Sequence, residues 1–332
     1  MAPQLAIGPF LPLLCCPRDG AHLNHSDGAL VCTTCAARYP VVGDGLVSFM
    51  DVAQLSEVDR GEQASRDQES AWYDTMFEGY ANAVEIPTVV RRLGHPGGPV
   101  LDHGAGTGRI TERLLTLGQP VVAVDYSAAS LERLLARCAG TSVPLLAVQA
   151  DIRRLPFCDA SFAAVASVQV YEHVRGRDER RRVLQELARV MTPGASLALT
   201  AFNFNLMFRT WRLLGNDGAR EGEHMLGGDF YYIRHTRREL RAELEDVFDV
   251  VELTGIRNIP ARKIAAVVRR TGFPAASDWL LDWMVEHGFR LDLALERTPL
   301  SSATGFWWLA HAVRRPSYQG ADGRAAGRAA PH

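Results

Sequence analysis

Residues 98–127 read GPVLDHGAGTGRITERLLTLGQPVVAVDYS and contain two apolar runs, a glycine loop and two aspartates. A short apolar run ends in Asp102, and the glycine loop GAGTG follows at 104–108. Apolar residues at helical spacing come next, and a second apolar run, 121–124, ends in Asp125. This order of strand, glycine turn, helix, strand and carboxylate predicts a βαβ unit that holds a ligand at its strand ends.

Each part of this unit has a physical use. Glycines allow a positive φ and a close approach of ligand atoms to the backbone. At the tip of the second strand, the carboxylate of Asp125 can accept hydrogen bonds from both hydroxyls of a ribose. The spacing is GxGxG rather than the GxGxxG that opens a pyrophosphate-binding helix, which disfavours an NAD-dependent oxidoreductase.

Four segments in order resemble the successive motifs of class I S-adenosylmethionine-dependent methyltransferases. They are LDHGAGTGR, AVDYS, QADIRRLPFCDASFAAVASVQVYEHV and ELARVMTPGASLALTAFN, within roughly residues 70–205. The resemblance implies a Rossmann-like, doubly wound α/β fold with a seven-stranded sheet that is mostly parallel and has an antiparallel last strand. It also implies S-adenosyl-L-methionine as the cofactor.

The resemblance carries over to particular residues. The glycine loop would pass the methionine part of the cofactor, Asp125 would bind the ribose, and Asp151 would lie by the adenine with Ile152 covering a ring face. His103 departs from the family pattern, in which a smaller or aliphatic residue is more usual. The expected cofactor-binding residues are Asp102, His103, Gly104, Ala105, Gly106, Gly108, Asp125, Tyr126, Asp151, Ile152 and Val168.

Two residues are candidates for roles in catalysis. His173 follows the fourth expected strand and has a side chain that titrates in the range useful for a general base. A structural or cofactor-side role is the alternative for His173. Tyr73 lies in a Tyr-Asp pair before the first strand and is a candidate lid of the pocket, or else a core residue.

Residues 13–50 contain four of the six cysteines and form a separate small unit. Cys32-x-x-Cys35 is half of a zinc knuckle, and Cys16 and Asp19 can complete a tetrahedral set, because zinc accepts carboxylate as well as thiolate. Cys15 or His22 could replace Asp19. The stretch resembles the zinc-ribbon-like Trm112 family in Cys16, Cys32, Cys35, Tyr39-Pro40 and Gly45-Leu46. The alternative is a metal-free module with reduced thiols.

The expected organisation of the chain follows from these segments. Residues 203–235 are rich in aromatic residues, which suggests either a pocket for an apolar or planar acceptor or a plain packing lid. An apolar stripe of Trp279, Leu280, Trp283 and Met284 suggests core or a dimer surface. The expected parts are a flexible N-terminus 1–12, a zinc-ribbon-like β module 13–50, a linker 51–70, a methyltransferase domain 71–315 with insertions 203–235 and 260–295, and a disordered tail 316–332.

Composition limits the class of protein. The formal net charge of −2 argues against a broad electrostatic grip on nucleic acid. No run reaches the roughly 18 apolar residues that span a bilayer, and the N-terminus lacks the basic region of a signal peptide. We therefore expect a cytoplasmic protein without membrane contact, in which Cys138 and Cys158 are reduced thiols.

The sequence thus predicts an enzyme that transfers a methyl group to an O, N or C nucleophile of a small molecule. Alignment of the reactants would be its main contribution, because charge disappears in the step. One alternative is an rRNA or tRNA methyltransferase whose N-terminal module reads RNA, although that module has few basic residues. Another is a non-catalytic Trm112-like binding protein, which the intact glycine loop and Asp125 disfavour.

Overall fold

The computed structural model describes residues 7–42, 45–50, 56–71, 79–215, 219–222, 231–259, 268, 270 and 274–318. Tyr73 lies outside the described residues, as do 1–6 and 319–332 of the two expected flexible ends. Within the described part of the chain, no helix has the length and apolar character to cross a membrane.

The centre of the sheet has the predicted Rossmann-like arrangement. Its strands are β5 (Val100–His103), β6 (Val121–Asp125), β7 (Leu145–Gln149), β8 (Phe162–Ser167), β9 (Met191–Phe202), β12 (Phe248–Ile256) and β13 (Trp307–Arg314). They lie in the order β7-β6-β5-β8-β9-β13-β12. The first five pair in parallel, and β13 runs antiparallel to both β9 and β12. Residues 121–124 are fully buried, as expected of a strand covered on both faces.

The sheet has eleven strands in the described chain, so the predicted number of seven is wrong. The N-terminal module adds β1 (Leu23–Ser26), β2 (Ala29–Cys32), β3 (Arg38–Val42) and β4 (Leu46–Ser48). β4 lies parallel to β7 with Val47 opposite Val148, and Leu46 packs in one cluster with Ala147. An unpaired edge strand exposes a row of N–H and C=O groups, and β4 satisfies those of β7.

The start of the chain is ordered further than predicted. Residues 7–13 form the helical turns α1 (Ile7–Phe10) and η1 (Leu11–Leu13). Ile7 and Phe10 are buried and belong to the same core cluster as Leu30 and Tyr39 of the module. The flexible segment expected over 1–12 is therefore wrong for residues 7–12, because two large apolar side chains cover the module's core.

The segment 51–70, predicted to be a linker, contains the helix α2 (Glu57–Glu69). Nε2 of Gln63 donates to the carbonyl oxygen of Tyr126 at 3.5 Å. Ser127 Oγ donates to the carboxylate of Asp67 at 2.5 Å. These polar contacts hold α2 against the residues that follow β6, so this part of the expected linker packs on the larger domain.

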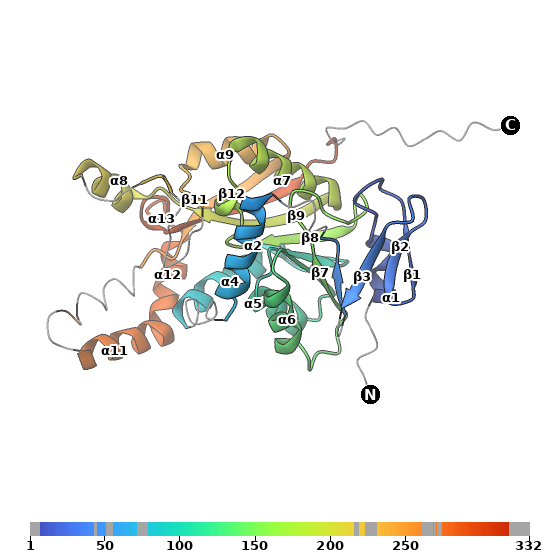
Figure 1. Ribbon diagram of the computed structural model, residues 1–332. Coiled ribbons are helices and arrows are strands. Elements are labelled where there is room, and N and C mark those ends of the chain that lie inside the picture. Colours follow the sequence, from blue (N-terminus) through green and yellow to red (C-terminus); the bar gives the residue numbers. More distant parts are fainter. Residues whose placement is uncertain are drawn as a thin grey trace.

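Helices cover both faces of the sheet. In Figure 1, α7 and α9 lie on one side and α5 and α6 on the other. The remaining elements include a separate two-stranded sheet, β10 with β11. Bounds are α4 (Tyr80–Leu93), α5 (Arg109–Thr116), α6 (Ala128–Arg137), η3 (Tyr171–His173), α7 (Arg177–Val190), α8 (Leu206–Leu213), β10 (Glu221–Gly222), β11 (Tyr232–Ile233), α9 (Arg237–Glu245), α11 (Pro274–Trp283), η4 (Met284–Gly288), α12 (Phe289–Leu295) and α13 (Ser301–Thr304).

The predicted apolar stripe divides between core and surface. α11 projects away from the sheet (Figure 1), and Trp279 is 65% exposed. Trp283 is 42% exposed and stacks on His287, whereas Met284 is buried. The core interpretation is therefore wrong for the two tryptophans. A dimer surface there stays a prediction.

Candidate functional site

The glycine turn after β5 is shaped by packing from two sides. The N–H of Gly104 donates to the carbonyl oxygen of Val124 at 2.8 Å. Gly104 has a φ of +71°, and a Cβ at this position would overlap Cγ2 of Val170. Gly108 has a φ of +90°, and its Cβ would lie 2.6 Å from Cγ of Leu134. Geometry therefore requires glycine at both positions.

The carboxylate of Asp125 lies at the tip of β6 and is fixed by backbone donors. Its Oδ2 accepts from the N–H of Gly106 at 2.8 Å, and its Oδ1 from the N–H of Ser127 at 2.9 Å. Burial raises the pKa of Asp125, and these two N–H groups oppose that rise. A carboxylate has about four acceptor positions. Two remain for a ligand, and the side chain is partly exposed.

A second acid from α2 lies near Asp125. Oε2 of Glu69 pairs with Arg66 at 3.1 Å. Burial raises the pKa of Glu69, Arg66 lowers it, and the Asp125 carboxylate raises it further. Two acids and one arginine make this edge net negative, which disfavours the phosphates of a dinucleotide.

Asp102 and His103 lie beneath the turn, where both are buried. Thr111 Oγ1 donates to Oδ2 of Asp102 at 2.6 Å, and burial raises the pKa of this carboxyl to about 6. Nδ1 of His103 lies 3.0 Å from Oγ of Ser167, and burial lowers the pKa of His103 to about 3. The unusual histidine is thus a neutral core residue that hydrogen-bonds the neighbouring strand β8.

The expected adenine-side residues follow β7 directly. Both oxygens of Asp151 accept from Nε of Arg153 at 2.9 Å, and Arg153 is a partner that sequence reasoning missed. Ile152 is partly buried against the main core. Val168 is buried in the cluster beneath the turn. Asp125 ends β6, and Asp151 and Ile152 follow the adjacent strand β7, so all three lie near the carboxyl ends of neighbouring strands.

His173 lies among aromatic residues at the end of β9. Its Nδ1 is 2.8 Å from the carbonyl oxygen of Tyr231, which can only accept, so Nδ1 carries the proton and Nε2 a lone pair. Burial lowers the pKa of His173 to about 3. Its ring centroid lies 6.0 Å from that of Phe202, which packs against Trp307 and Tyr232. We call Phe202, His173, Tyr232 and Trp307 the aromatic cluster.

Sequence reasoning missed a buried ionic network between α4 and the turn. Glu85 has no exposed surface, and its carboxylate pairs with Arg109 at 2.8 Å and Arg257 at 3.1 Å. Nε2 of Gln169 donates to the same carboxylate at 2.8 Å. Buried charges are rare unless paired. The sequence signal for this network was the acidic residue Glu85 within the largely apolar run NAVEIPTVV, since a buried glutamate needs a charged partner.

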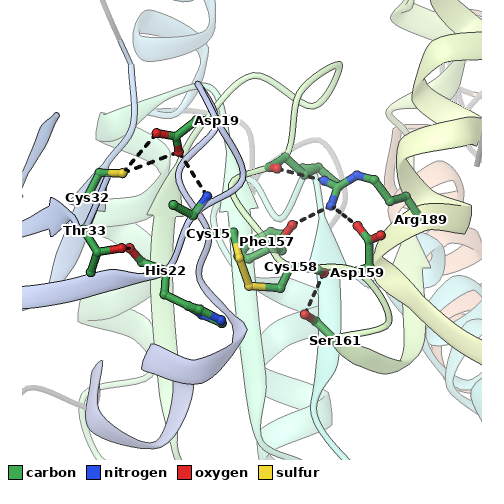
Figure 2. Close-up of a disulfide and its surroundings, with 12 residues drawn as sticks. Cys15, Asp19, His22, Cys32, Thr33, Phe157, Cys158, Asp159, Ser161 and Arg189 are labelled. Carbon is green, nitrogen blue, oxygen red and sulfur yellow. Dashed lines mark hydrogen bonds and ion pairs between the residues drawn. A yellow bond between two sulfur atoms is a disulfide. The ribbon is translucent and has the colours of Figure 1, made fainter. Parts of the chain in front are cut away.

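The structure brings the four expected metal ligands together. One donor atom from each of Cys16, Asp19, Cys32 and Cys35 lies within 4.8 Å of the others. Figure 2 shows Asp19 facing Cys32, with 3.4 Å between Sγ and each carboxylate oxygen. Sγ of Cys16 lies 3.7 Å from Sγ of Cys35. Two Zn–S bonds of about 2.3 Å at a tetrahedral angle would separate the sulfurs by about 3.8 Å.

The prediction of a reduced Cys158 is wrong, because Cys158 forms a disulfide with Cys15 (Figure 2). Backbone hydrogen bonds beside it, from Cys15 to Pro156 and from Cys158 to Leu13, place these two segments of the chain side by side. The disulfide also removes Cys15 as an alternative metal ligand. His22 lies next to Cys15 and Cys158 rather than in the four-residue group. Cys138 is a free, buried thiol, as predicted.

Comparisons with known proteins match the central part of the chain. Residues 101–199 match the family model described as a methyltransferase domain. Demethylmenaquinone methyltransferase from Corynebacterium urealyticum is 31% identical over 156 residues, 42% of this chain and 64% of that protein. The Mycobacterium tuberculosis protein of the same name is 32% identical over 165 residues, 45% of this chain and 67% of its own length. The chain therefore spans about two thirds of these relatives.

Solved structures show the same fold. The [4+2]-cyclase SpnF has a TM-score of 0.53 at 17% identity, over 77% of this chain and 97% of that one. A Haemonchus contortus phosphoethanolamine N-methyltransferase 2, in complex with S-adenosyl-L-methionine, has a TM-score of 0.51 at 16% identity, over 79% and 61%. The matched domain, the mycobacterial relative, the strand order and the glycine turn all agree. The chain belongs to the class I S-adenosylmethionine-dependent methyltransferases.

Proposed function

We propose that the chain binds S-adenosyl-L-methionine at the carboxyl ends of β5, β6 and β7 and transfers its methyl group to a small molecule. The observation that carries this proposal is the Asp125 carboxylate, held by two backbone N–H groups with acceptor positions to spare. Those positions fit the two hydroxyls of the cofactor's ribose. The net negative charge nearby suits a sulfonium better than a phosphate.

Other residues at this edge have proposed roles around the cofactor. The glycine turn gives the methionine part a close approach to the backbone. Asp151 and Ile152 flank the adenine, and α2 borders the same edge through Gln63 and Asp67. The remaining proposed contacts or supports are Asp102, His103, Gly104, Ala105, Gly106, Gly108, Tyr126 and Val168.

The acceptor is proposed to be apolar or planar and to bind by the aromatic cluster. Phe202 and Trp307 pack at 4.9 Å between ring centroids at the end of β9, where doubly wound folds place ligands. Curated relatives named for demethylmenaquinone, a quinone, support a small planar acceptor. The nucleophile is an O, N or C atom of this molecule.

The chain contributes mainly alignment to the reaction. The cofactor, when bound, supplies an electrophilic methyl group, and well-oriented reactants are worth on the order of 7–11 kcal/mol. Where the acceptor must lose a proton, Nε2 of His173 holds the lone pair that can take it, because Nδ1 is committed to Tyr231. Its lowered pKa makes it a weak base, so positioning is the larger contribution.

The N-terminal module is proposed to hold one Zn²⁺. Cys16, Asp19, Cys32 and Cys35 fit the ion in donor type and in the 3.7 Å sulfur separation. The metal would stabilise a module whose own core is small.

Calorimetric titration of the full chain with S-adenosylhomocysteine tests the proposal, with NAD⁺ as the comparison ligand. We expect saturable binding of the first and none of the second. Incubation with S-adenosylmethionine labelled in its methyl group and a panel of quinols and phenols then tests transfer. A chain that binds neither ligand, or binds NAD⁺ alone, would refute the cofactor assignment.

A further inference from the structure

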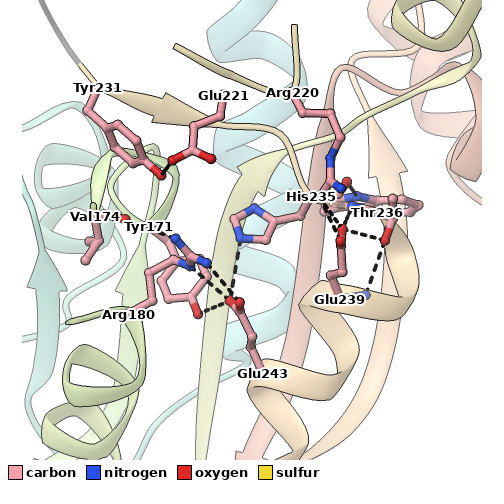
Figure 3. A network of polar contacts seen from close by, with 11 residues as sticks. Tyr171, Val174, Arg180, Arg220, Glu221, Tyr231, His235, Thr236, Glu239 and Glu243 are labelled. Atoms are coloured by element: carbon pink, nitrogen blue, oxygen red, sulfur yellow. Dashed lines mark hydrogen bonds and ion pairs between the residues drawn. The ribbon is translucent and has the colours of Figure 1, made fainter. Parts of the chain in front are cut away.

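A cavity of about 480 Å³ lies among residues of α7, β11 and α9. It is bounded by the start of α7, by β11 and by the start of α9 (Figure 3). Tyr171 stacks on His235 beside it, and the neighbouring Val170 packs against Gly104, so η3 separates the cavity from the glycine turn. The lining residues include Arg177, Arg180, Arg220, His235, Arg238, Glu239 and Glu243.

The lining carries more positive than negative charge. Arg180 pairs with Glu243 at 3.1 Å, and Arg220 pairs with Glu239 at 2.7 Å. Two further arginines on the lining, at 177 and 238, have no ion-pair partner among the described residues. Four arginines against two glutamates leave an excess of two positive charges, which favours an anionic ligand.

Two buried polar atoms on the lining need partners that the described chain does not supply. His235 is 1% exposed, with Nε2 at 3.5 Å from Glu243 and with no hydrogen-bond partner for Nδ1. In Figure 3 its ring lies between Glu243 and Arg220. Nε of Arg220 is also buried without a partner. Buried polar groups are normally hydrogen-bonded, and an arginine N–H can be satisfied only by an acceptor such as a ligand oxygen.

The start of α7 adds to this preference. Arg177 is its first residue, Gly176 supplies no side-chain cap, and the unpaired N–H groups of a helix N-terminus attract anions. The start of α9 contributes less, because Thr236 and Glu239 already form a capping box there. One open helix end, two unpaired arginines and two unsatisfied buried atoms thus lie around one cavity.

We propose that this cavity binds the oxyanion group, phosphate or carboxylate, of a small molecule. The arginine fork recognises either group bidentately. The volume admits more than the oxyanion itself, so the rest of the ligand can lie toward the side of β11. This site is separate from the proposed methyl transfer and does not depend on it.

Titration of the full chain in Tris-chloride at fixed ionic strength tests the site with two probes, inorganic phosphate and glutarate. We expect saturable binding of at least one, and the probe that binds identifies the group. The double variant Arg177→Gln/Arg238→Gln should weaken binding about tenfold, as two exposed charge contacts imply. These side chains are exposed, so the fold should be retained.

The matched control is Arg181→Gln/Arg237→Gln, which removes the same charge from the same two helices outside the cavity. We expect its affinity to equal that of the wild type. No saturable binding of either probe, or equal weakening in both variants, would overturn the proposal. Parallel titrations with S-adenosylhomocysteine keep the two proposals apart, because phosphate binding without cofactor binding would refute only the methyl-transfer assignment.

Discussion

The backbone N–H of Gly106 donates a 2.8 Å hydrogen bond to Oδ2 of Asp125. The carboxylate proposed to hold the ribose therefore also fixes the middle of the glycine turn. Removal of this carboxylate should therefore disturb both the proposed ribose contact and the shape of the glycine turn.

We expect Asp125→Ala to lower the affinity for S-adenosylhomocysteine by about 1–3 kcal/mol, the typical cost of losing hydrogen bonds to a charged group. Calorimetric titration measures the change. Asp159→Ala is the control, because Asp159 is exposed and pairs with Arg189 elsewhere. Equal affinities in all three proteins would remove Asp125 from the cofactor site.

Gly104→Ala should destabilise the fold through two separable effects. The left-handed φ costs about 1–2 kcal/mol, and the overlap with Val170 adds about 1–3 kcal/mol of overpacking. Gly194→Ala is a matched control, since Gly194 has a φ of +79° but open space around its Cβ. Urea unfolding measures the free energies.

Val170→Ala in the Gly104→Ala background should recover the packing part, because the two residues are in direct contact. If the double variant is no more stable than Gly104→Ala, Val170 does not set the shape of the turn.

Reduction should destabilise the chain, because the Cys15–Cys158 disulfide joins residues 143 positions apart. Losing a native disulfide typically costs about 2–5 kcal/mol. We expect dithiothreitol to lower the Tm of the wild type and to leave the Cys15→Ser/Cys158→Ser variant unchanged. If the Tm of the wild type were the same with and without dithiothreitol, the disulfide would not form in solution.

Asp19→Cys should tighten zinc binding, because it replaces the carboxylate of the proposed site with a thiolate. Cys35→Ser should lower the zinc content from about one ion per chain. Elemental analysis after dialysis against graded chelator measures both. Ser26→Cys adds a thiol on an exposed strand residue and serves as the control. Identical retention in Asp19→Cys and Ser26→Cys would refute the site.

Glu172 should make stability fall as pH rises. Burial raises its pKa to about 8, whereas an unfolded glutamate titrates at about 4.3. Between these values the folded state holds a proton that the unfolded state has lost. The contribution is therefore fully present below about pH 4.3 and declines above it, by up to about 1.4 kcal/mol per pH unit.

Glu172→Gln cannot ionise and keeps an acceptor for Nε1 of Trp307. Its stability relative to the wild type should rise between about pH 5 and pH 8, measured by urea unfolding. Glu179→Gln, on the start of α7, provides the comparison. A difference that stays constant across this range would contradict the protonated state of Glu172.

Local patterns predicted much of the fold. The glycine turn and Asp125 at a strand tip were predicted from residues within a few positions of each other, and the Ser127 cap of α6 is a feature of the same local kind. Thr236 caps α9 in the same way, through a capping box. Such features depend on near neighbours, whose chemistry the sequence displays directly.

Features that join distant segments were not predictable. Cys15 gives no sign of its partner, and the three-residue strand β4 does not reveal that it pairs with β7. Glu85 and Arg257, 172 positions apart, form an ion pair that only the folded chain brings together. Pairing over such distances depends on topology, which short apolar runs leave open.

The junction between β4 and β7 has a consequence for how this molecule holds together. The three residues Leu46 to Ser48 pair with β7, so β7 is an internal strand of the sheet instead of its edge. Removal of the N-terminal module would leave β7 as an unpaired edge strand, whose free N–H and C=O groups could pair with another polypeptide. The N-terminal module therefore protects the larger domain against edge-to-edge association, in addition to any role of its own.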